Sequence, residues 1–210
     1  LMIPICDRRG RVIAFGGRVL NPDDQPKYMN SPQSVLFDKS NVLFGYHLAN
    51  QAIREADAAI IVEGYMDVMI PHQAGYKNVV APMGTALTEA HLQQLQRLTK
   101  RFILALDPDA AGIHGTLQGL ETARQTLDRE WDAVFDPRGL VGVEGRLKAD
   151  IRVVALPEGR DPDELILEDR ERWEQLITNS QPIVRFVFEQ LLKQEDPREP
   201  KGKARIVDAM

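Results

Sequence analysis

The feature that most constrains this chain is a regular alternation of short apolar runs and amphipathic segments. Four apolar runs have the length of buried strands and no polar alternation; they cover 58–62, 78–82, 101–106 and 151–156. Segments with apolar residues at helical spacing separate them, at 66–74, 88–99 and 111–129. Uniformly apolar strands between amphipathic helices predict an α/β fold, with a parallel sheet covered by helices on both faces.

The segments on either side do not follow this alternation. The opening reads as a hairpin of 2–6 and 11–20, followed by an irregular loop at 21–34 and a helix at 41–56. Residues 131–149 carry turn signals and only short apolar pieces, which indicates an insertion, such as a hairpin, between a helix and a strand. After Pro157 the pattern is helical only, at 162–168, 171–178, 182–193 and from 203 onward.

Composition excludes several classes of protein. A hydrophobic content of 43% with 27% charged residues is typical of a globular chain, and no apolar run is long enough to cross a membrane. A lone cysteine, Cys6, excludes an intrachain disulfide and a cysteine-based zinc site, and the four histidines lack metal-binding spacing. With no secretory signal, we expect a cytoplasmic location. Because the chain starts at Leu1 and stops within a predicted helix, we expect a fragment, with a monomer as the default.

Charge is distributed unevenly along the chain. Residues 1–50 contain six Lys/Arg and four Asp/Glu, a net charge of +2, whereas the other 160 residues contain 20 and 27, a net charge of −7. Phosphate affinity depends on local positive charge, so a nucleic-acid contact is expected on the first third. The acidic remainder is then available for another task, such as holding a divalent cation.

Acidic side chains follow three of the four predicted core strands. In a parallel sheet the carboxyl ends of the strands meet at one edge, where ligands bind. The carboxylates that follow the strands include Glu63 and Asp67, Asp107 and Asp109, and Asp161 and Asp163. Such a group repels itself unless a cation neutralises it, and magnesium prefers oxygen ligands. The pattern therefore predicts a magnesium site at this edge.

Each acidic residue also has a purely structural interpretation. Asp161, followed by Pro162 and two further acids, fits the start of a helix, and this alone explains those residues. Asp109 fits a helix cap in the same way, and Asp67 fits a surface position as well as it fits one that supports the metal ligands. The structural interpretation is weakest for Glu63, which directly follows an apolar strand.

The basic candidates lie upstream. Arg18, Lys27 and Lys39 are either ordinary surface charges or phosphate contacts, with Asn30 as a polar partner and Tyr28 as a stacking surface. Glycines after the strands, including Gly84 before Thr85, are explained by tight turns and also permit close approach of a phosphate. These two interpretations stay open on the residues alone.

Several motifs together resemble a known family. Glu63-Gly64-Tyr65-Met66-Asp67, then Gly84-Thr85, then 107–112 (Asp-Pro-Asp-Ala-Ala-Gly) resemble the Toprim signature of primases, topoisomerases and some nucleases. Upstream, 15–19, 26–32 and 43–46 resemble bacterial replicative DNA primases specifically. The resemblance covers about residues 1–130 and 150–190. It implies that residues 1–56 are the C-terminal part of a basic N-terminal subdomain. Residues 57–168 would be a Toprim domain that contains the 131–149 insertion, and residues 169–210 would begin a helical subdomain.

The resemblance also implies roles for single residues. Glu63, Asp107 and Asp109 would ligate a catalytic Mg²⁺, which Mn²⁺ can replace. The supporting acidic positions would be Asp67, Asp161 and Asp163. The residues implied to bind template and nucleotide are Arg18, Lys27, Asn30, Lys39, Gly84 and Thr85, with Lys27 and Lys39 also acting in catalysis. The implied reaction is template-directed synthesis of short RNA primers from ribonucleoside triphosphates on single-stranded DNA.

This sequence lacks some features of the family, and their absence limits the activity that we expect from the chain alone. The family's zinc module and its helicase-binding carboxyl region have no counterpart here, so no zinc is expected, and contact with the replicative helicase would need that missing region. We expect weak primer synthesis or none, at a bacterial replication fork. Two other functions stay open: a Toprim nuclease or phosphotransferase with the same acids, and a non-catalytic nucleic-acid-binding module whose acids are only caps and turns.

Overall fold

The structure is a computed structural model of the chain. It describes residues 1–21, 23, 25–84, 86–105, 129–135, 141–147, 149–157, 160–194 and 197–209. Most of the helix predicted at 111–129 lies outside the described residues, and Arg129 begins a strand.

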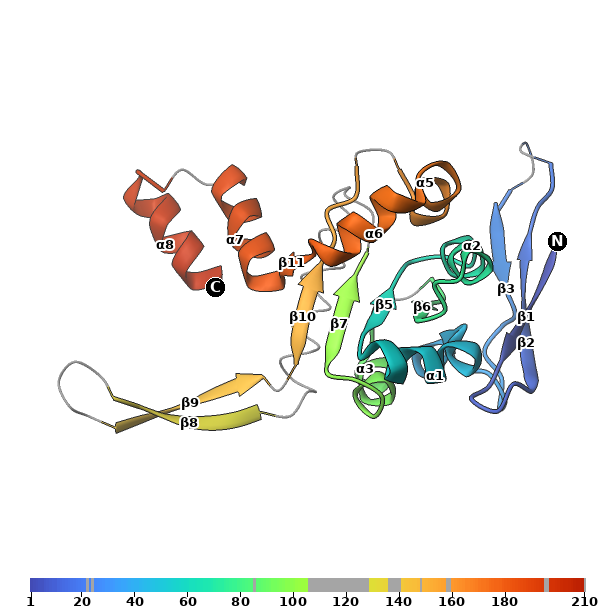
Figure 1. Cartoon of the computed structure of the whole chain (residues 1–210), viewed down its shortest axis with the longest axis horizontal. Coiled ribbons are helices and arrows are strands. Elements are labelled where there is room, and N and C mark those ends of the chain that lie inside the picture. The colour runs from blue at the N-terminus through green and yellow to red at the C-terminus, as the bar shows by residue number, and fades with distance from the viewer. Residues whose placement is uncertain are drawn as a thin grey trace.

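A six-stranded sheet forms the centre of the molecule (Figure 1). Its strands, in spatial order, are β4 (Leu43–Phe44), β6 (Val79–Pro82), β5 (Ala59–Ile61), β7 (Arg101–Leu104), β10 (Asp150–Val153) and β11 (Gln181–Pro182). The four inner strands pair in parallel, which confirms the predicted α/β fold. The two edge strands pair antiparallel and contain only two residues each, and the sequence pattern did not indicate either of them.

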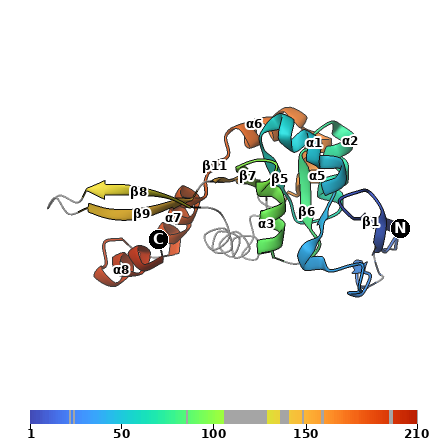
Figure 2. The same cartoon turned by 90° about the horizontal axis from the view of Figure 1, so that it is seen from below.

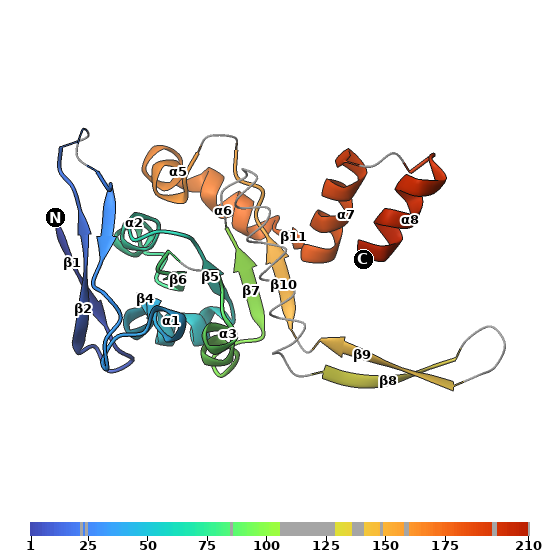
Figure 3. The same cartoon turned by 180° about the vertical axis from the view of Figure 1, so that it is seen from behind.

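Helices cover both faces of this sheet. Successive strand residues point to opposite sides, and because these residues are apolar, both faces must be buried. One buried cluster contains Ile61 and Leu104 from the strands, together with residues of α1 (Tyr46–Ala56), α3 (Glu89–Gln96) and α7 (Ile183–Gln194). The opposite cluster contains Ile60 and Ile103 together with residues of α2 (Met66–Ala74), α5 (Pro162–Glu168) and α6 (Arg170–Thr178). Figures 1 and 3 show α1 and α3 on one side of the sheet and α5 and α6 on the other.

A second, three-stranded antiparallel sheet lies at the N-terminal end. It is formed by β1 (Met2–Cys6), β2 (Val12–Arg18) and β3 (Tyr28–Asn30), in that order. The predicted hairpin is therefore confirmed, but the interpretation of 21–34 as wholly irregular is wrong, because β3 lies within it. A third buried cluster, including Ile5, Phe37 and Tyr65, packs this sheet against the rest of the molecule.

The helix predicted over 41–56 begins later than the apolar spacing indicates. The segment before it forms the 3-10 turn η1 (Lys39–Asn41) and then β4, and α1 begins after Gly45. Gly45 has a φ of +80°, and a Cβ there would lie 2.7 Å from Cγ1 of Val68. This left-handed turn changes the chain direction and ends the extended segment before the helix.

The remaining elements lie toward the C-terminus. An antiparallel hairpin of β8 (Arg129–Phe135) and β9 (Val141–Leu147) occupies the predicted insertion. Figure 2 shows the hairpin extending from the body on the side away from the N-terminus, the side on which α7 and α8 (Pro200–Ala209) also lie. In the part of the chain that the structure describes, no helix is long and apolar enough to cross a bilayer.

Candidate active site

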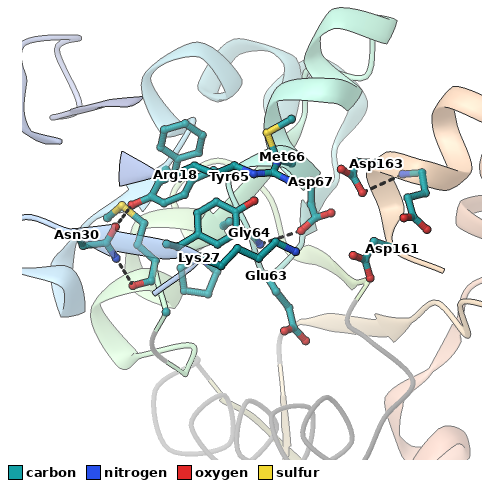
Figure 4. Close-up of a pocket in the computed structure, with 17 residues that line it drawn as sticks. Arg18, Lys27, Asn30, Glu63, Gly64, Tyr65, Met66, Asp67, Asp161 and Asp163 are labelled. Atoms are coloured by element: carbon teal, nitrogen blue, oxygen red, sulfur yellow. Dashed lines mark hydrogen bonds between the residues drawn. The ribbon is translucent and has the colours of Figure 1, made fainter. Parts of the chain in front are cut away.

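One cavity, of about 340 Å³, lies between the N-terminal sheet and the carboxyl ends of β5 and β6 (Figure 4). Residues of β2, of β3 and just before β3 form one wall, and the loops before α2 and α5, with the first turns of these helices, form the other. Besides Tyr28 and Tyr65, the polar and charged residues that line it are Arg18, Lys27, Asn30, Glu63, Asp67, Asp161, Asp163 and Glu164. The sheet edge predicted to bind ligands therefore does carry a cavity with acids on one side and bases on the other.

Asp67 is the most electrostatically perturbed residue of the acidic wall. It lies in the first turn of α2, and its Oδ2 accepts a hydrogen bond from the backbone N–H of Gly64 at 3.0 Å. Burial, reinforced by the nearby charges of Asp163 and Asp161, raises the pKa of Asp67 to about 7. A cation bound between these carboxylates would relieve this repulsion, so the wall is suited to positive charge.

Asp161 tests the helix-cap interpretation directly. It occupies the N-cap position of α5 with Pro162 at the first helical position, as the sequence predicted. Its side chain, however, makes no capping hydrogen bond, and it lines the cavity together with Asp163. Capping therefore accounts for the position of Asp161 in the sequence but leaves its carboxylate available for another role.

Glu63 lies two residues after the end of β5 and is exposed to solvent. In Figure 4 its carboxylate points away from those of Asp67, Asp161 and Asp163. Among the residues that the structure describes, no three His, Cys, Asp or Glu side chains are grouped closely enough to hold a metal ion. The predicted ligands Asp107 and Asp109, and Thr85 of the nucleotide site, lie outside the described residues.

The basic wall consists of Arg18 at the end of β2 and Lys27 just before β3. Both side chains extend along the ring of Tyr28, whose centroid is 5.3 Å from Cζ of Arg18 and 6.0 Å from Nζ of Lys27. Contacts of this kind restrict long cationic side chains at little cost. The two charges are thereby directed over the cavity, where a phosphate would meet them.

Asn30 lines the cavity, but its side chain is already hydrogen-bonded to protein groups. Its Oδ1 accepts a hydrogen bond from the hydroxyl of Tyr65, and its Nδ2 donates to the carbonyl of Met83 at 3.5 Å. The Tyr65 ring is buried and packs edge-on against Phe44, with 4.7 Å between centroids. Sequence analysis missed this role of Tyr65, since a tyrosine between two motif residues carries no periodic signal.

The structure separates Lys39 from the other predicted basic residues. Lys39 belongs to η1, is half-buried and does not line the cavity, and its carbonyl faces Nε2 of His91 at 3.1 Å. Gly84 does line the cavity, with a φ of +68° that only glycine adopts readily.

Both family models and individual proteins of known function match this chain. Residues 57–130 match the family model of the Toprim domain, and residues 1–50 match that of the DNA primase catalytic core, N-terminal domain. The chain is 39% identical over 211 residues to a DNA primase of Legionella pneumophila, covering 100% of this chain and 34% of that protein.

Solved structures of primase catalytic domains are also similar to this chain. A DNA primase domain from Pseudomonas aeruginosa is 39% identical with a TM-score of 0.81, and the match covers 98% of this chain and 59% of that one. A DnaG primase catalytic domain bound to single-stranded DNA is 38% identical with a TM-score of 0.80, over 98% of this chain and 60% of that one.

The fold and the matched segment at 57–130 thus define a Toprim domain. With the adjoining match at 1–50, the chain belongs to the family of bacterial DNA primases and corresponds to part of their catalytic core. It spans about a third of the length of the curated relatives that it matches.

Proposed function

We propose that this chain takes part in template-directed synthesis of RNA primers on single-stranded DNA, as a portion of a primase catalytic core. The observation that carries the proposal is the placement of Arg18 and Lys27 across one cavity from Asp67, Asp161 and Asp163. Nucleotidyl transfer needs this division, because cations must contact the phosphates while carboxylates hold a divalent metal.

In the proposed reaction, the 3′-hydroxyl of the primer attacks the α-phosphate of a ribonucleoside triphosphate. A new phosphorus–oxygen bond forms, and the bond to pyrophosphate breaks. Mg²⁺, or Mn²⁺ in its place, would supply charge neutralisation and favour deprotonation of the hydroxyl. The repelling carboxylates around Asp67 fit such a hard cation.

The residue roles are proposals drawn from the motifs, and the placement supports those of Arg18, Lys27, Asp67, Asp161 and Asp163. Glu63, Asp107 and Asp109 would hold the metal, with Asp67, Asp161 and Asp163 supporting it. Arg18, Lys27 and Lys39 would contact template and nucleotide phosphates, and the Gly84–Thr85 turn would approach the nucleotide. Asn30 would act by orienting Tyr65 at the cavity wall, because its side chain already has two partners.

The proposed ligands are ribonucleoside triphosphates, single-stranded DNA and the RNA primer, with the replicative helicase as a partner of the longer protein. The proposed location is the replication fork in the bacterial cytoplasm. We also propose residues 1–56, 57–168 and 169–210 as the limits of the basic, Toprim and helical parts.

Calorimetric titration with GTP, with and without Mn²⁺, tests the site. Lys27→Gln should weaken Mn²⁺-dependent GTP binding at least about tenfold, since it removes a charge-assisted contact with phosphate. Lys77→Gln, which removes an exposed charge beyond α2, is the matched control and should bind as the wild type does. Binding that ignores both Mn²⁺ and Lys27→Gln would contradict the proposal.

An activity assay separates the two other functions. Because the chain spans a third of its relatives, we expect weak primer synthesis or none from it alone. Cleavage of single-stranded DNA without ribonucleotides would favour a Toprim nuclease. DNA binding that is indifferent to Mg²⁺ and to Asp109→Asn would favour a non-catalytic binding module.

A further inference from the structure

A second cavity, of about 490 Å³, lies at the opposite end of β2 from the candidate active site. Three arginines of the β1–β2 turn line it, facing polar residues of η1, α1 and α3. The polar and charged side chains that line it are Cys6, Asp7, Arg8, Arg9, Arg11, Asn41, Tyr46 and Gln94. Figure 3 shows this turn beside α1, and a Cβ at Gly10 would lie 3.4 Å from the His47 ring.

The turn is organised around Asp7. Its Oδ1 accepts hydrogen bonds from the backbone N–H groups of Arg9 at 2.8 Å and Arg11 at 3.0 Å. Its Oδ2 pairs with Nε and Nη2 of Arg11 at 2.7 Å and 2.6 Å. Arg11 therefore neutralises Asp7, and within the described residues neither Arg8 nor Arg9 has a salt-bridge partner.

Arg8 is held in place by a buried residue. Its Nε donates to Oε1 of Gln94 at 3.3 Å, and Gln94 is only 4% exposed. Nε2 of Gln94 in turn donates to the carbonyls of Asn41 at 2.8 Å and Ala90 at 3.0 Å. Because this bond uses only Nε, the guanidinium end of Arg8 is oriented in advance without being neutralised. Orientation of this kind reduces the entropy lost when a ligand binds.

The ligand chemistry follows from these charges. A guanidinium matches a phosphate with two parallel hydrogen bonds, and two uncompensated arginines stand out in a chain of net charge −5. The side of the pocket formed by Arg8 and Arg9 is therefore suited to phosphates, while Ile13, Leu36, Val42 and Leu43 line the remainder.

The position of the pocket favours a strand over a free nucleotide. The seven residues of β2 connect it to Arg18, a separation of about 20 Å at the usual rise per strand residue. We propose that Arg8 and Arg9 bind the phosphate backbone of single-stranded nucleic acid outside the candidate active site. The choice of nucleic acid as ligand rests on the proposed function.

Fluorescence anisotropy with a labelled oligothymidylate of about 20 nucleotides in EDTA tests the proposal. The variant Arg8→Gln/Arg9→Gln should bind about tenfold more weakly at low salt. The slope of log K against log salt should fall in magnitude by about 1.4, the value for two phosphate contacts on a single strand. The control Lys77→Gln/Lys100→Gln removes the same charge from exposed positions elsewhere. Equal losses in both variants would overturn the proposal.

Two further measurements guard against misfolding and against another ligand. In the wild type, oligothymidylate should protect Arg8 and Arg9, but not exposed Arg97, from phenylglyoxal; equal labelling with and without DNA would overturn the proposal. Mn²⁺-dependent GTP binding should survive in Arg8→Gln/Arg9→Gln, and its selective loss with DNA binding intact would make the pocket a nucleotide site instead. Because the DNA titration needs no metal, failure of the proposed catalytic site would leave this result readable.

Discussion

The hydroxyl of Tyr65 donates a hydrogen bond to Oδ1 of Asn30, joining the loop that carries the acidic motif to the last strand of the N-terminal sheet. The same asparagine reaches the carbonyl of Met83, which follows β6. Three segments that line the cavity therefore meet at one amide. Together with the buried cluster that includes Ile5, Phe37 and Tyr65, this junction holds the basic wall against the acidic wall.

Tyr65→Phe removes this hydrogen bond and leaves Asn30 Oδ1 without its partner. We expect a loss of about 1–3 kcal/mol in the free energy of unfolding, measured by urea denaturation. The control Tyr76→Phe removes a hydroxyl that bonds to Glu174 at an exposed position, and it should cost less. Equal losses in the two variants would mean that the junction adds no more stability than an exposed hydrogen bond does.

Gly16→Ala should disrupt the same junction sterically. A Cβ at residue 16 would lie 2.8 Å from Cζ of Tyr65, so the buried ring would have to shift. We expect a loss of about 1–3 kcal/mol in stability, together with weaker GTP binding. Gly17→Ala is the matched control in the same strand, since its Cβ would meet nothing nearer than the carbonyl of Met29 at 3.7 Å.

Asp67→Asn should stabilise the metal-free chain at high pH. The pKa of Asp67 is raised to about 7 in the folded chain from 3.8, so the folded state binds this proton more tightly than the unfolded state. The charged carboxylate therefore lowers stability increasingly as pH rises from about 4 to about 7. In EDTA at about pH 8 we expect Asp67→Asn to raise the free energy of unfolding by on the order of 2 kcal/mol, and to make no difference near pH 4.

The effect of added Mg²⁺ gives the complementary measurement. Mg²⁺ should raise the melting temperature of the wild type more than that of Asp67→Asn, because the variant has less repulsion to relieve. Asp23→Asn, at an exposed loop position, is the control and should respond to Mg²⁺ as the wild type does. A wild type that is unaffected by Mg²⁺ would count against cation binding at this wall.

His91 should make stability depend on pH in the opposite direction. Its Nδ1 accepts from the N–H of Thr88 at 3.2 Å, so the neutral ring donates from Nε2 to the carbonyl of Lys39. Burial lowers the pKa of His91 below 6.5. The unfolded state then binds more protons, and stability is lost as pH falls below about 6.5.

Two measurements check this histidine. Ring ¹⁵N shifts should show the neutral Nε2–H form of His91 persisting at about pH 6. His91→Gln should flatten the dependence of unfolding free energy on pH more than His47→Gln does, because the imidazole of His47 is less buried. A ring of His91 that is fully charged at about pH 6 would contradict the hydrogen bonding described above.

The sequence by itself determined the α/β class, the inner strands and the opening hairpin. These features have strong local signals: runs such as 58–62 are uniformly apolar because both faces of the strand are buried, and the Asp7–Gly10 turn directs the hairpin. The order of strands and acids along the chain also placed Asp67, Asp161 and Asp163 at one sheet edge. This edge is a consequence of parallel topology and needs no knowledge of side-chain contacts.

Only the tertiary structure decided which groups are available at the cavity. The motif assigned Asn30 to ligand binding, but its amide is bonded to Tyr65 and Met83, and the pattern near Lys39 did not show that this lysine lies outside the cavity. The edge strands β4 and β11 have two residues each, too few for any period to appear. In all these cases the deciding partner is distant in sequence, so local spacing carries no information about it.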